Sequence, residues 1–241
     1  MNTSLTIELA RHDQLERMRE IYRRAGRIHI APALSDESAQ AIYRSLVEEV
    51  PWQLHLNDGE RSYDLAEEQI KALPEPNRVL LHERLMENAA TRFQYLFDNF
   101  PVSDAAALGR HQELLVMRVL EFLNSGTFLD FARAVTDESR ILFADAQATR
   151  YRPGHFLTQH DDSELKAERI AAYVLNLTPS WRADWGGVLQ FLDREGHVVE
   201  GYKPVFNALN IFRVPQPHSV SYVTPFARAA RFSISGWLRS R

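Results

Sequence analysis

The stretch "FLTQHDDSE", residues 156–164, places one imidazole beside two carboxylates directly after the turn-like sequence "YRPGH". Two interpretations compete: a solvated acidic turn, or two ligands of a metal site. Side chains two residues apart in a strand lie on the same face, so we expect His160 and Asp162 to project together and Asp161 to point away. Two ligands do not complete a metal site, so the second interpretation requires a third ligand elsewhere in the chain.

A second histidine, His218 in "PQPHSV", begins another β-type segment far downstream. Two histidines and one carboxylate on one face form the facial triad of non-haem Fe(II) oxygenases, which leaves positions open for a co-substrate and oxygen. His155 also lies near His160, but its odd offset is expected to turn it outward. With nine histidines in the chain, the "HDD" sequence alone does not decide between the two interpretations.

The C-terminal sequence "RFSISGW" carries a second polar pattern. In a strand Arg231, Ser233 and Ser235 share one face, and Phe232 and Ile234 share the other. Either the polar face is a solvent-facing edge, or Arg231 and Ser233 point inward and receive an anionic ligand. The second hypothesis follows from the chemistry of arginine, which binds carboxylates through two parallel hydrogen bonds.

The spacing of apolar residues changes near residue 140. Before it, apolar residues recur mainly at helical spacing, which predicts helices over residues 77–97 and 107–123, with short strands at "RIHIAP" and "WQLHLN". After it, many short β-type segments separated by turn residues predict a sandwich or a barrel. No repeat or linker separates the parts. We therefore expect one domain over residues 1–241, with a mostly helical support in 1–139 and a β core in 140–241.

Local signals mark the ends of the first two helices. Gly26 is placed to end a helix that begins near Leu15. Ser35 is placed to cap the second helix, and Pro51 to stop it.

Composition narrows the class of protein. The chain has 241 residues, a formal net charge of −4 and no cysteine. The charge gives no basic footprint for nucleic acid, and the lack of cysteine excludes disulfides and thiolate metal sites, so any metal must be held by His, Asp and Glu. We find no signal peptide and no apolar run of the roughly 20 residues that a bilayer span needs. We expect a cytoplasmic protein without nucleic-acid or membrane partners; its oligomeric state stays open.

Five stretches occur in a distinctive order: "RYRPGHFLTQHDD", "RIAAYVLNLTPSWRADWGGVLQF", "NALNIF", "PHSV" and "RFSISGW". This ordered set resembles the 2-oxoglutarate- and Fe(II)-dependent dioxygenase family, in particular its prolyl-hydroxylase-like branch. "RIHIAPALSDESAQAIYRSL" further resembles the opening segment of the yeast-type prolyl dihydroxylases of the translation machinery. The resemblance implies a mainly β fold with a helical N-terminal part (α+β), a double-stranded β-helix or distorted jelly roll with packed helices.

The resemblance also implies roles for particular side chains. The cofactors would be Fe(II), the co-substrate 2-oxoglutarate and O₂. The distal carboxylate of 2-oxoglutarate would be bound by Arg231 and Ser233, in a pocket lined by Tyr151. The iron ligands would be His160, Asp162 and His218.

Two glycines and two tryptophans complete the comparison. Gly186 and Gly187 match a Gly-Gly pair that lets a strand start close to its neighbours. We expect a structural role for Trp181 and leave open whether Trp185 lies in the core or at the rim.

The sequence departs from the family pattern in two places. The loop before Arg231 is longer than usual, so Arg228 is a rival for the carboxylate-binding role. Val174 stands where prolyl hydroxylases often have a second co-substrate tyrosine, and the adjacent Tyr173 is expected to face the other way.

The function implied by the resemblance is hydroxylation of a prolyl residue or a proline-like substrate, with succinate and CO₂ as co-products. Asp162 occupies the position that halogenating relatives leave for a halide, which favours hydroxylation. The alternatives are hydroxylation of another free amino acid or small metabolite, and a degenerate barrel acting as a binding module. The complete ligand set argues against the last, but the sequence does not choose between a peptide and a free amino acid.

Overall fold

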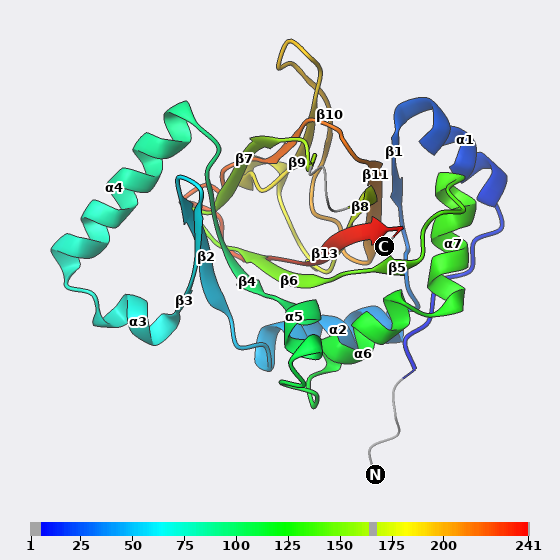
Figure 1. Ribbon diagram of the computed structural model, residues 1–241, viewed down its shortest axis with the longest axis horizontal. Helices are drawn as coiled ribbons and strands as arrows, with labels where there is room; N and C mark the ends of the chain where they lie inside the picture. Colours follow the sequence, from blue (N-terminus) through cyan, green and yellow to red (C-terminus); the bar gives the residue numbers. More distant parts are fainter. Residues whose placement is uncertain (1–5, 164–167, 241) are drawn as a thin grey trace.

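A computed structural model describes residues 6–163 and 168–240 (Figure 1). Its helices are α1 (Leu15–Ala25), α2 (Asp36–Glu48), α3 (Glu67–Ala72), α4 (Glu75–Thr91), α5 (Val102–Ala107), α6 (Leu115–Leu123), α7 (Gly126–Thr136) and the 3₁₀ turn η1 (Ala183–Trp185). Its strands are β1 (Arg27–Ile30), β2 (Gln53–Asp58), β3 (Arg61–Ala66), β4 (Tyr95–Phe100), β5 (Phe143–Ala144), β6 (Gln147–Tyr151), β7 (Phe156–His160), β8 (Arg169–Asn176), β9 (Leu189–Leu192), β10 (Val198–Tyr202), β11 (Ala208–Arg213), β12 (His218–Val220) and β13 (Arg231–Arg239).

The strands form a single sheet that rolls around on itself. They follow the order β1-β11-β8-β13-β6-β4-β7-β12-β9-β10, with β2 and β3 added beside β4 and β5 beside β13. The paired strands run antiparallel, including β13 with both β6 and β8. In Figure 1 the strands β7, β9 and β10 lie across from β6 and β13, so the sheet encloses a central space. The predicted jelly roll with packed helices is confirmed.

The two ends of the sheet meet through side chains. β1 and β10 stand at opposite ends of the strand order. Arg27 of β1 forms an ion pair with Glu200 of β10, and the rings of His29 and Tyr202 lie 5.3 Å apart. The roll is thus closed at this seam by side-chain contacts between its end strands.

The helices cover the outside of the roll. Figure 1 shows α2, α5 and α6 along one side of the sheet, α1 and α7 beside β1, and α3 and α4 beyond β2 and β3. Ile42 and Leu46 of α2 and Tyr173 of β8 are fully buried in the core between the helices and the sheet. Each large apolar side chain buried in this way stabilises the fold by about 1.5–3 kcal/mol. Among the described residues, no helix has both the length and the apolar character that a membrane span requires.

The predicted helix ends are confirmed where the signal is local. Gly26 takes the left-handed conformation after α1, and its N–H donates to the carbonyl of Tyr22 at 2.7 Å. The hydroxyl of Ser35 accepts from the backbone N–H of Ser38 at the start of α2. Because both signals depend only on neighbouring residues, the sequence is sufficient to predict them.

The helix predicted over residues 77–97 is wrong in its last part. α4 ends at Thr91, and Tyr95–Phe100 form β4, whose six residues are all buried. Periodicity does not distinguish a short buried apolar run such as Tyr95–Phe97 from a segment of a buried helix. The helix predicted over residues 107–123 is confirmed only in its second part, as α6, because α5 ends at Ala107 and residues 108–114 are not helical. The N-terminal part therefore contributes β1 to β4 to the sheet as well as helices.

The Gly186–Gly187 pair lies where the chain passes close to the backbone at Tyr222. Gly186 has a φ of 70°, and a Cβ atom placed on it would lie 1.9 Å from the Tyr222 carbonyl oxygen. Gly187 has a φ of 62°, and its N–H donates to the carbonyl of Ser221 at 3.0 Å. The close approach predicted for this pair is confirmed.

We expect Gly186→Ala to destabilise the protein by about 2 kcal/mol or more, because it combines left-handed backbone strain with a backbone clash. Gly126→Ala is the matched control, since nothing lies within 4 Å of a Cβ atom at that position. Thermal unfolding followed by circular dichroism measures both. Equal melting temperatures for the two variants would contradict the packing described here.

Candidate active site

Strands β7 and β12 bring two histidines face to face. His160 ends β7 and His218 begins β12, and the two are direct cross-strand partners. Their ring centroids lie 4.0 Å apart. The carboxylate of Asp162 lies 3.5 Å from His160 Nε2 and 3.6 Å from His218 Nε2. The ligand atoms of these three side chains all lie within 4.8 Å of one another, so the predicted ligand set is brought together.

Hydrogen bonds to the backbone orient both imidazoles toward Asp162. His160 Nδ1 lies 3.0 Å from the carbonyl oxygen of Thr158, and His218 Nδ1 lies 2.8 Å from that of Gln216. A carbonyl only accepts, so Nδ1 of each ring carries a proton, and Nε2 is the nitrogen left to bind a metal. Burial, and then the neighbouring His160, lower the pKa of His218 to about 4. His218 is therefore neutral at pH 7, as a metal ligand must be.

The side chains of Asp161 and Asp162 point in different directions, but strand alternation is not the cause. β7 ends at His160, and Asp162 has a left-handed backbone with a φ of 60°, held by a 3.1 Å hydrogen bond from Arg169 Nη1 to its carbonyl. Asp161 instead accepts from the backbone N–H and hydroxyl of Ser163, and these bonds lower the Asp161 pKa. The predicted directions are right, but a turn rather than a continuing strand produces them.

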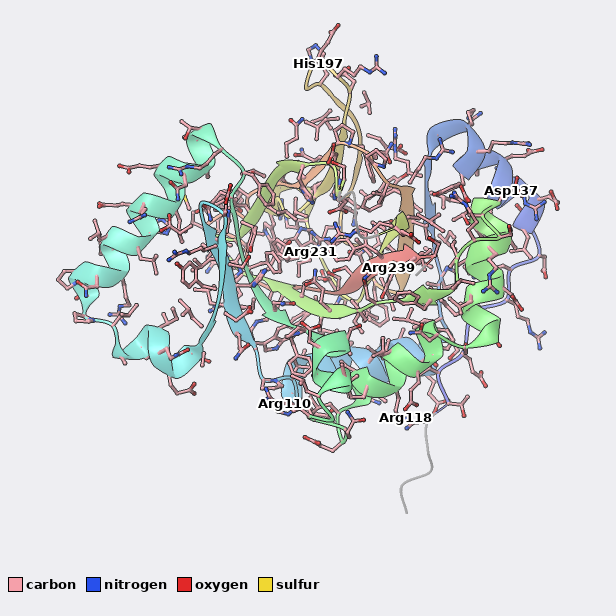
Figure 2. The ribbon with its side chains drawn as sticks, in the orientation of Figure 1. Arg110, Arg118, Asp137, His197, Arg231 and Arg239 are labelled. Atoms are coloured by element: carbon pink, nitrogen blue, oxygen red, sulfur yellow. The ribbon has the colours of Figure 1, made fainter. Side chains whose placement is uncertain are left out.

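Arg231 is a buried cation at the start of β13, near the middle of the molecule in Figure 2. Its Nη1 donates to the carbonyl of Gly187 at 3.1 Å, and its guanidinium carbon lies 5.1 Å from the centre of the Tyr151 ring. Its Nε is buried and makes no hydrogen bond, and no carboxylate among residues 6–163 and 168–240 forms an ion pair with this side chain. Burial lowers the pKa of Arg231, yet a guanidinium stays protonated in proteins. Because an unpaired buried charge is strongly unfavourable, the arrangement suits an anionic ligand.

Polar groups on neighbouring strands extend this end of the site. Ser233 is buried, and its hydroxyl lies 2.8 Å from the hydroxyl of Thr149 on β6. Tyr151 is the cross-strand partner of Arg231, and burial raises the pKa of its phenol, which therefore remains a donor. Sequence analysis missed Thr149, although its position two residues before Tyr151 places it on the same strand face.

The two arginines considered for binding the co-substrate carboxylate lie in different environments. Arg231 lines the central cavity, whereas Arg228 is exposed in the loop before β13. Val174 lines the cavity where a second tyrosine was expected from the family pattern. The hydroxyl of Tyr173 donates to the carbonyl of Asp145 at 2.7 Å, so this side chain faces away as predicted.

His155 is not part of the ligand group, but the expectation that it faces outward is wrong. It is buried, with Nδ1 3.4 Å from the carbonyl oxygen of Arg150. Burial lowers the pKa of His155 to about 4. It precedes β7, so strand alternation counted back from His160 does not apply to it.

An aromatic wall from β2 and β4 forms one side of the site. His55 stacks on Tyr95 with ring centroids 4.6 Å apart, and Phe97 stacks on Tyr151 at 5.0 Å. Sequence analysis missed this wall, because no local pattern tells that β4 pairs with β6 and β2 with β4. The cavity bounded by the wall has a volume of about 270 Å³ and is also lined by His160, Asp162, His218, Tyr151, Arg231 and Ser233.

Comparison with known proteins agrees with this geometry. Residues 146–239 match the family model of the 2OG-Fe(II) oxygenase superfamily. Over 145 residues, or 57% of the chain, the sequence is 32% identical to prolyl 3-hydroxylase OGFOD1 of Mus musculus. The match covers 26% of that protein, so the chain spans only about a quarter of its length.

Two solved structures have the same fold. One is a prolyl-4-hydroxylase of Pseudomonas putida, with 21% identity, a TM-score of 0.53 and coverage of 94% of this chain and 99% of that one. The other is a prolyl hydroxylase from Trichoplax adhaerens in complex with a hypoxia inducible factor peptide fragment, with 14% identity, a TM-score of 0.58 and coverage of 96% and 94%.

Over residues 146–239 the chain is similar to the 2OG-Fe(II) oxygenase superfamily. It is also similar to a prolyl 3-hydroxylase over part of that protein's length. The similarity implies Fe(II), 2-oxoglutarate and O₂ as cofactors, and two features of the site fit them. Two histidines and one carboxylate are the donor set of non-haem Fe(II) oxygenases. The buried cation Arg231 suits the distal carboxylate of 2-oxoglutarate.

We expect Asp162→Ala to weaken Mn(II) binding by about a hundredfold or more, because loss of a direct ligand exceeds the 10–100-fold effect of losing a supporting group. Asp161→Ala is the matched control, since Asp161 is the adjacent carboxylate and its side chain accepts from Ser163 rather than facing the histidines. Titration with Mn(II) followed by electron paramagnetic resonance measures both affinities. Unchanged binding in Asp162→Ala would remove this residue from the ligand set.

We expect Arg231→Ala to weaken 2-oxoglutarate binding by about two orders of magnitude or more, because truncating one partner of a buried charge pair costs roughly 2–5 kcal/mol. Arg231→Lys should not restore the affinity, because lysine lacks the planar fork that binds a carboxylate. Arg228→Ala should change it little. Calorimetric titration of the Mn(II)-loaded variants distinguishes them, and a large loss in Arg228→Ala would show that the exposed arginine binds the co-substrate.

Proposed function

We propose that this chain is a 2-oxoglutarate-dependent Fe(II) dioxygenase that hydroxylates a prolyl residue or a proline-like substrate, with succinate and CO₂ as co-products. The observation that carries the proposal is an unpaired buried guanidinium in the same cavity as a two-histidine, one-carboxylate ligand group. Similarity to a prolyl 3-hydroxylase supports the choice of substrate. The proposal treats residues 1–241 as a single domain, supported by the continuous sheet, and places the protein in the cytoplasm, with which the cysteine-free sequence is compatible.

In this proposal His160, Asp162 and His218 would hold Fe(II), and this donor set would leave the metal free to bind a co-substrate and oxygen. The carbonyls of Thr158 and Gln216 keep each imidazole in the tautomer that binds metal. These backbone contacts raise the basicity of the ligands and fix their orientation before the metal arrives. The protein thus presents a preorganised group of three donors.

The co-substrate would be oriented by side chains of the same cavity. Arg231 would bind the distal carboxylate of 2-oxoglutarate and Ser233 would share it through its hydroxyl, in a pocket that Tyr151 also lines. Gly187 holds the guanidinium in place through its carbonyl. When bound, Fe(II) and 2-oxoglutarate supply the oxidising chemistry that inserts one oxygen atom of O₂ into a substrate C–H bond.

The cavity walls keep the reacting groups away from bulk water. Phe212 lies edge-on to His218 with ring centroids 4.7 Å apart, and Phe93 lies 5.4 Å from the ring of His160. Apolar surroundings strengthen the electrostatic interactions inside the site and protect a reactive centre from side reactions. The protein therefore contributes binding, orientation and exclusion of water, and the cofactors contribute the reaction itself.

We expect the Fe(II)-loaded protein with 2-oxoglutarate to add the mass of one oxygen atom to proline-containing peptides. The measurement is a mass-spectrometric screen of free amino acids, proline-containing peptides and a proteome extract, with fragmentation to locate the added oxygen. Asp162→Ala is the control, because the product must disappear with the metal ligand. Oxygen insertion found only on a metabolite unrelated to proline would overturn the proposed substrate class.

A further inference from the structure

A second hollow adjoins the central cavity, and the two share part of their lining. Gln147, Gly236 and Trp237 line both. The second hollow, which we name the α5–α6 groove, has a volume of about 530 Å³. Apart from the shared residues, it is bounded chiefly by Asp104 and Ala107 of α5, Leu120 and Asn124 at α6, and Asp145 and Arg239 beside β5 and β13. The two hollows therefore lie next to each other at Gln147 and Trp237.

The central cavity is too small to enclose a peptide together with the co-substrate. Its volume of about 270 Å³ is below the range of about 300–1,000 Å³ that is usual for sites enclosing one small molecule. With 2-oxoglutarate bound against Arg231, the remaining space suits a single side chain. The rest of a peptide substrate must lie outside the cavity, along its rim.

The aromatic side of the rim offers few free polar groups to a peptide. His55 Nδ1 lies 2.7 Å from a carboxylate oxygen of Asp64, and the Tyr95 hydroxyl lies 2.6 Å from that of Ser62. These polar groups are already paired with one another. A peptide passing over this side would have to break the pairs to gain hydrogen bonds of its own.

The rim formed by β6 and β13 carries polar side chains without hydrogen-bond partners among the described residues. Gln147 and Ser235 are direct cross-strand partners with half-buried side chains, and neither side chain makes a hydrogen bond within residues 6–163 and 168–240. An extended peptide presents one N–H and one C=O per residue, which are the complements that the side chains of Gln147 and Ser235 require.

The charge of the α5–α6 groove indicates the charge of the peptide segment that it can bind. Asp145 is paired with Arg239 at 3.3 Å, so this pair adds no net charge. Asp104 is exposed and forms no ion pair with the described residues. The groove is thus weakly acidic, which suits a neutral or basic segment rather than an acidic one.

We propose that the α5–α6 groove binds the segment of an extended peptide substrate that flanks the oxidised residue, with Gln147 as the contact at the junction with the central cavity. This inference rests on the proposed function and deepens it, because it assigns the substrate to the peptide class and gives the path of its chain. A free amino acid would have no use for the groove.

The test fills the groove without touching the central cavity. Ala107→Trp places a large side chain at an exposed lining position, and Leu108→Trp places the same side chain at the next residue, which is exposed but does not line the groove. The probes are a library of roughly ten-residue peptides with a central proline, which span up to about 35 Å when extended, and N-acetylproline amide as the short counterpart. KM and kcat are measured from the added oxygen, together with the 2-oxoglutarate turnover that occurs without a substrate.

We expect Ala107→Trp to raise the KM for the long peptides by about tenfold or more with kcat little changed, because remote contacts are lost while the reacting centre is intact. The short probe and the substrate-free turnover should be unaffected, and Leu108→Trp should behave as the wild type. Equal effects of Ala107→Trp and Leu108→Trp on the long peptides would overturn the inference. So would an equal loss on the long and short probes.

A binding measurement separates this inference from the proposed function. Because the natural chain has no cysteine, Ala107→Cys and Leu108→Cys each allow a single fluorescent label, in protein loaded with Mn(II) so that no turnover is needed. Peptides that occupy the groove should change the signal at position 107 and not at 108. Binding without a signal at 107 would refute the groove, whereas a signal at 107 without oxygen insertion at proline would refute the proposed reaction alone.

Discussion

The burial of the Arg231 guanidinium on the inner face of β13 is the interaction on which the arrangement of the site depends. A buried cation is tolerated only where hydrogen-bond acceptors surround it and an anion completes the set. Gly187 provides the acceptor within the protein, and it reaches Arg231 only because the Gly186–Gly187 pair allows the chain to pass tightly against Tyr222. The burial of the Arg231 charge therefore depends on the backbone conformation of the Gly186–Gly187 loop.

β13 connects this constraint to the rest of the fold. It pairs with β6 and β8 and, at its end, with β5, so its alternation is imposed on several neighbouring strands. Arg231 and Ser233 face the cavity, while Ile234 and Leu238 face the helices. A shift of one residue in the register would exchange these two faces, placing apolar groups at the co-substrate end and a charge in the core. The strand pairing and the chemistry of the site therefore select the same register.

The parts of the site that the sequence predicts are those fixed by near neighbours. The alternating face that begins at Arg231 follows from short spacings, and so does Thr149, which was overlooked. The proximity of Asp162 to His160 was predicted from their spacing, but a turn produces it. The aromatic wall does not follow from short spacings, because the contact of His55 with Tyr95 depends on which distant strands pair. The left-handed turn at Asp162 was also beyond prediction, since αL is disfavoured for residues other than glycine and no local pattern demanded it here.

The seam between β1 and β10 bears on how the molecule behaves at high concentration. A strand at the end of a sheet exposes unpaired backbone groups that can template the strand of another molecule. β10 is such a strand, and its Val198 and Val199 are 53% and 52% exposed. The Arg27–Glu200 pair places charged groups at this exposed strand and joins the two end strands of the sheet to each other. The same contact that closes the roll thus also guards the protein against edge-to-edge aggregation.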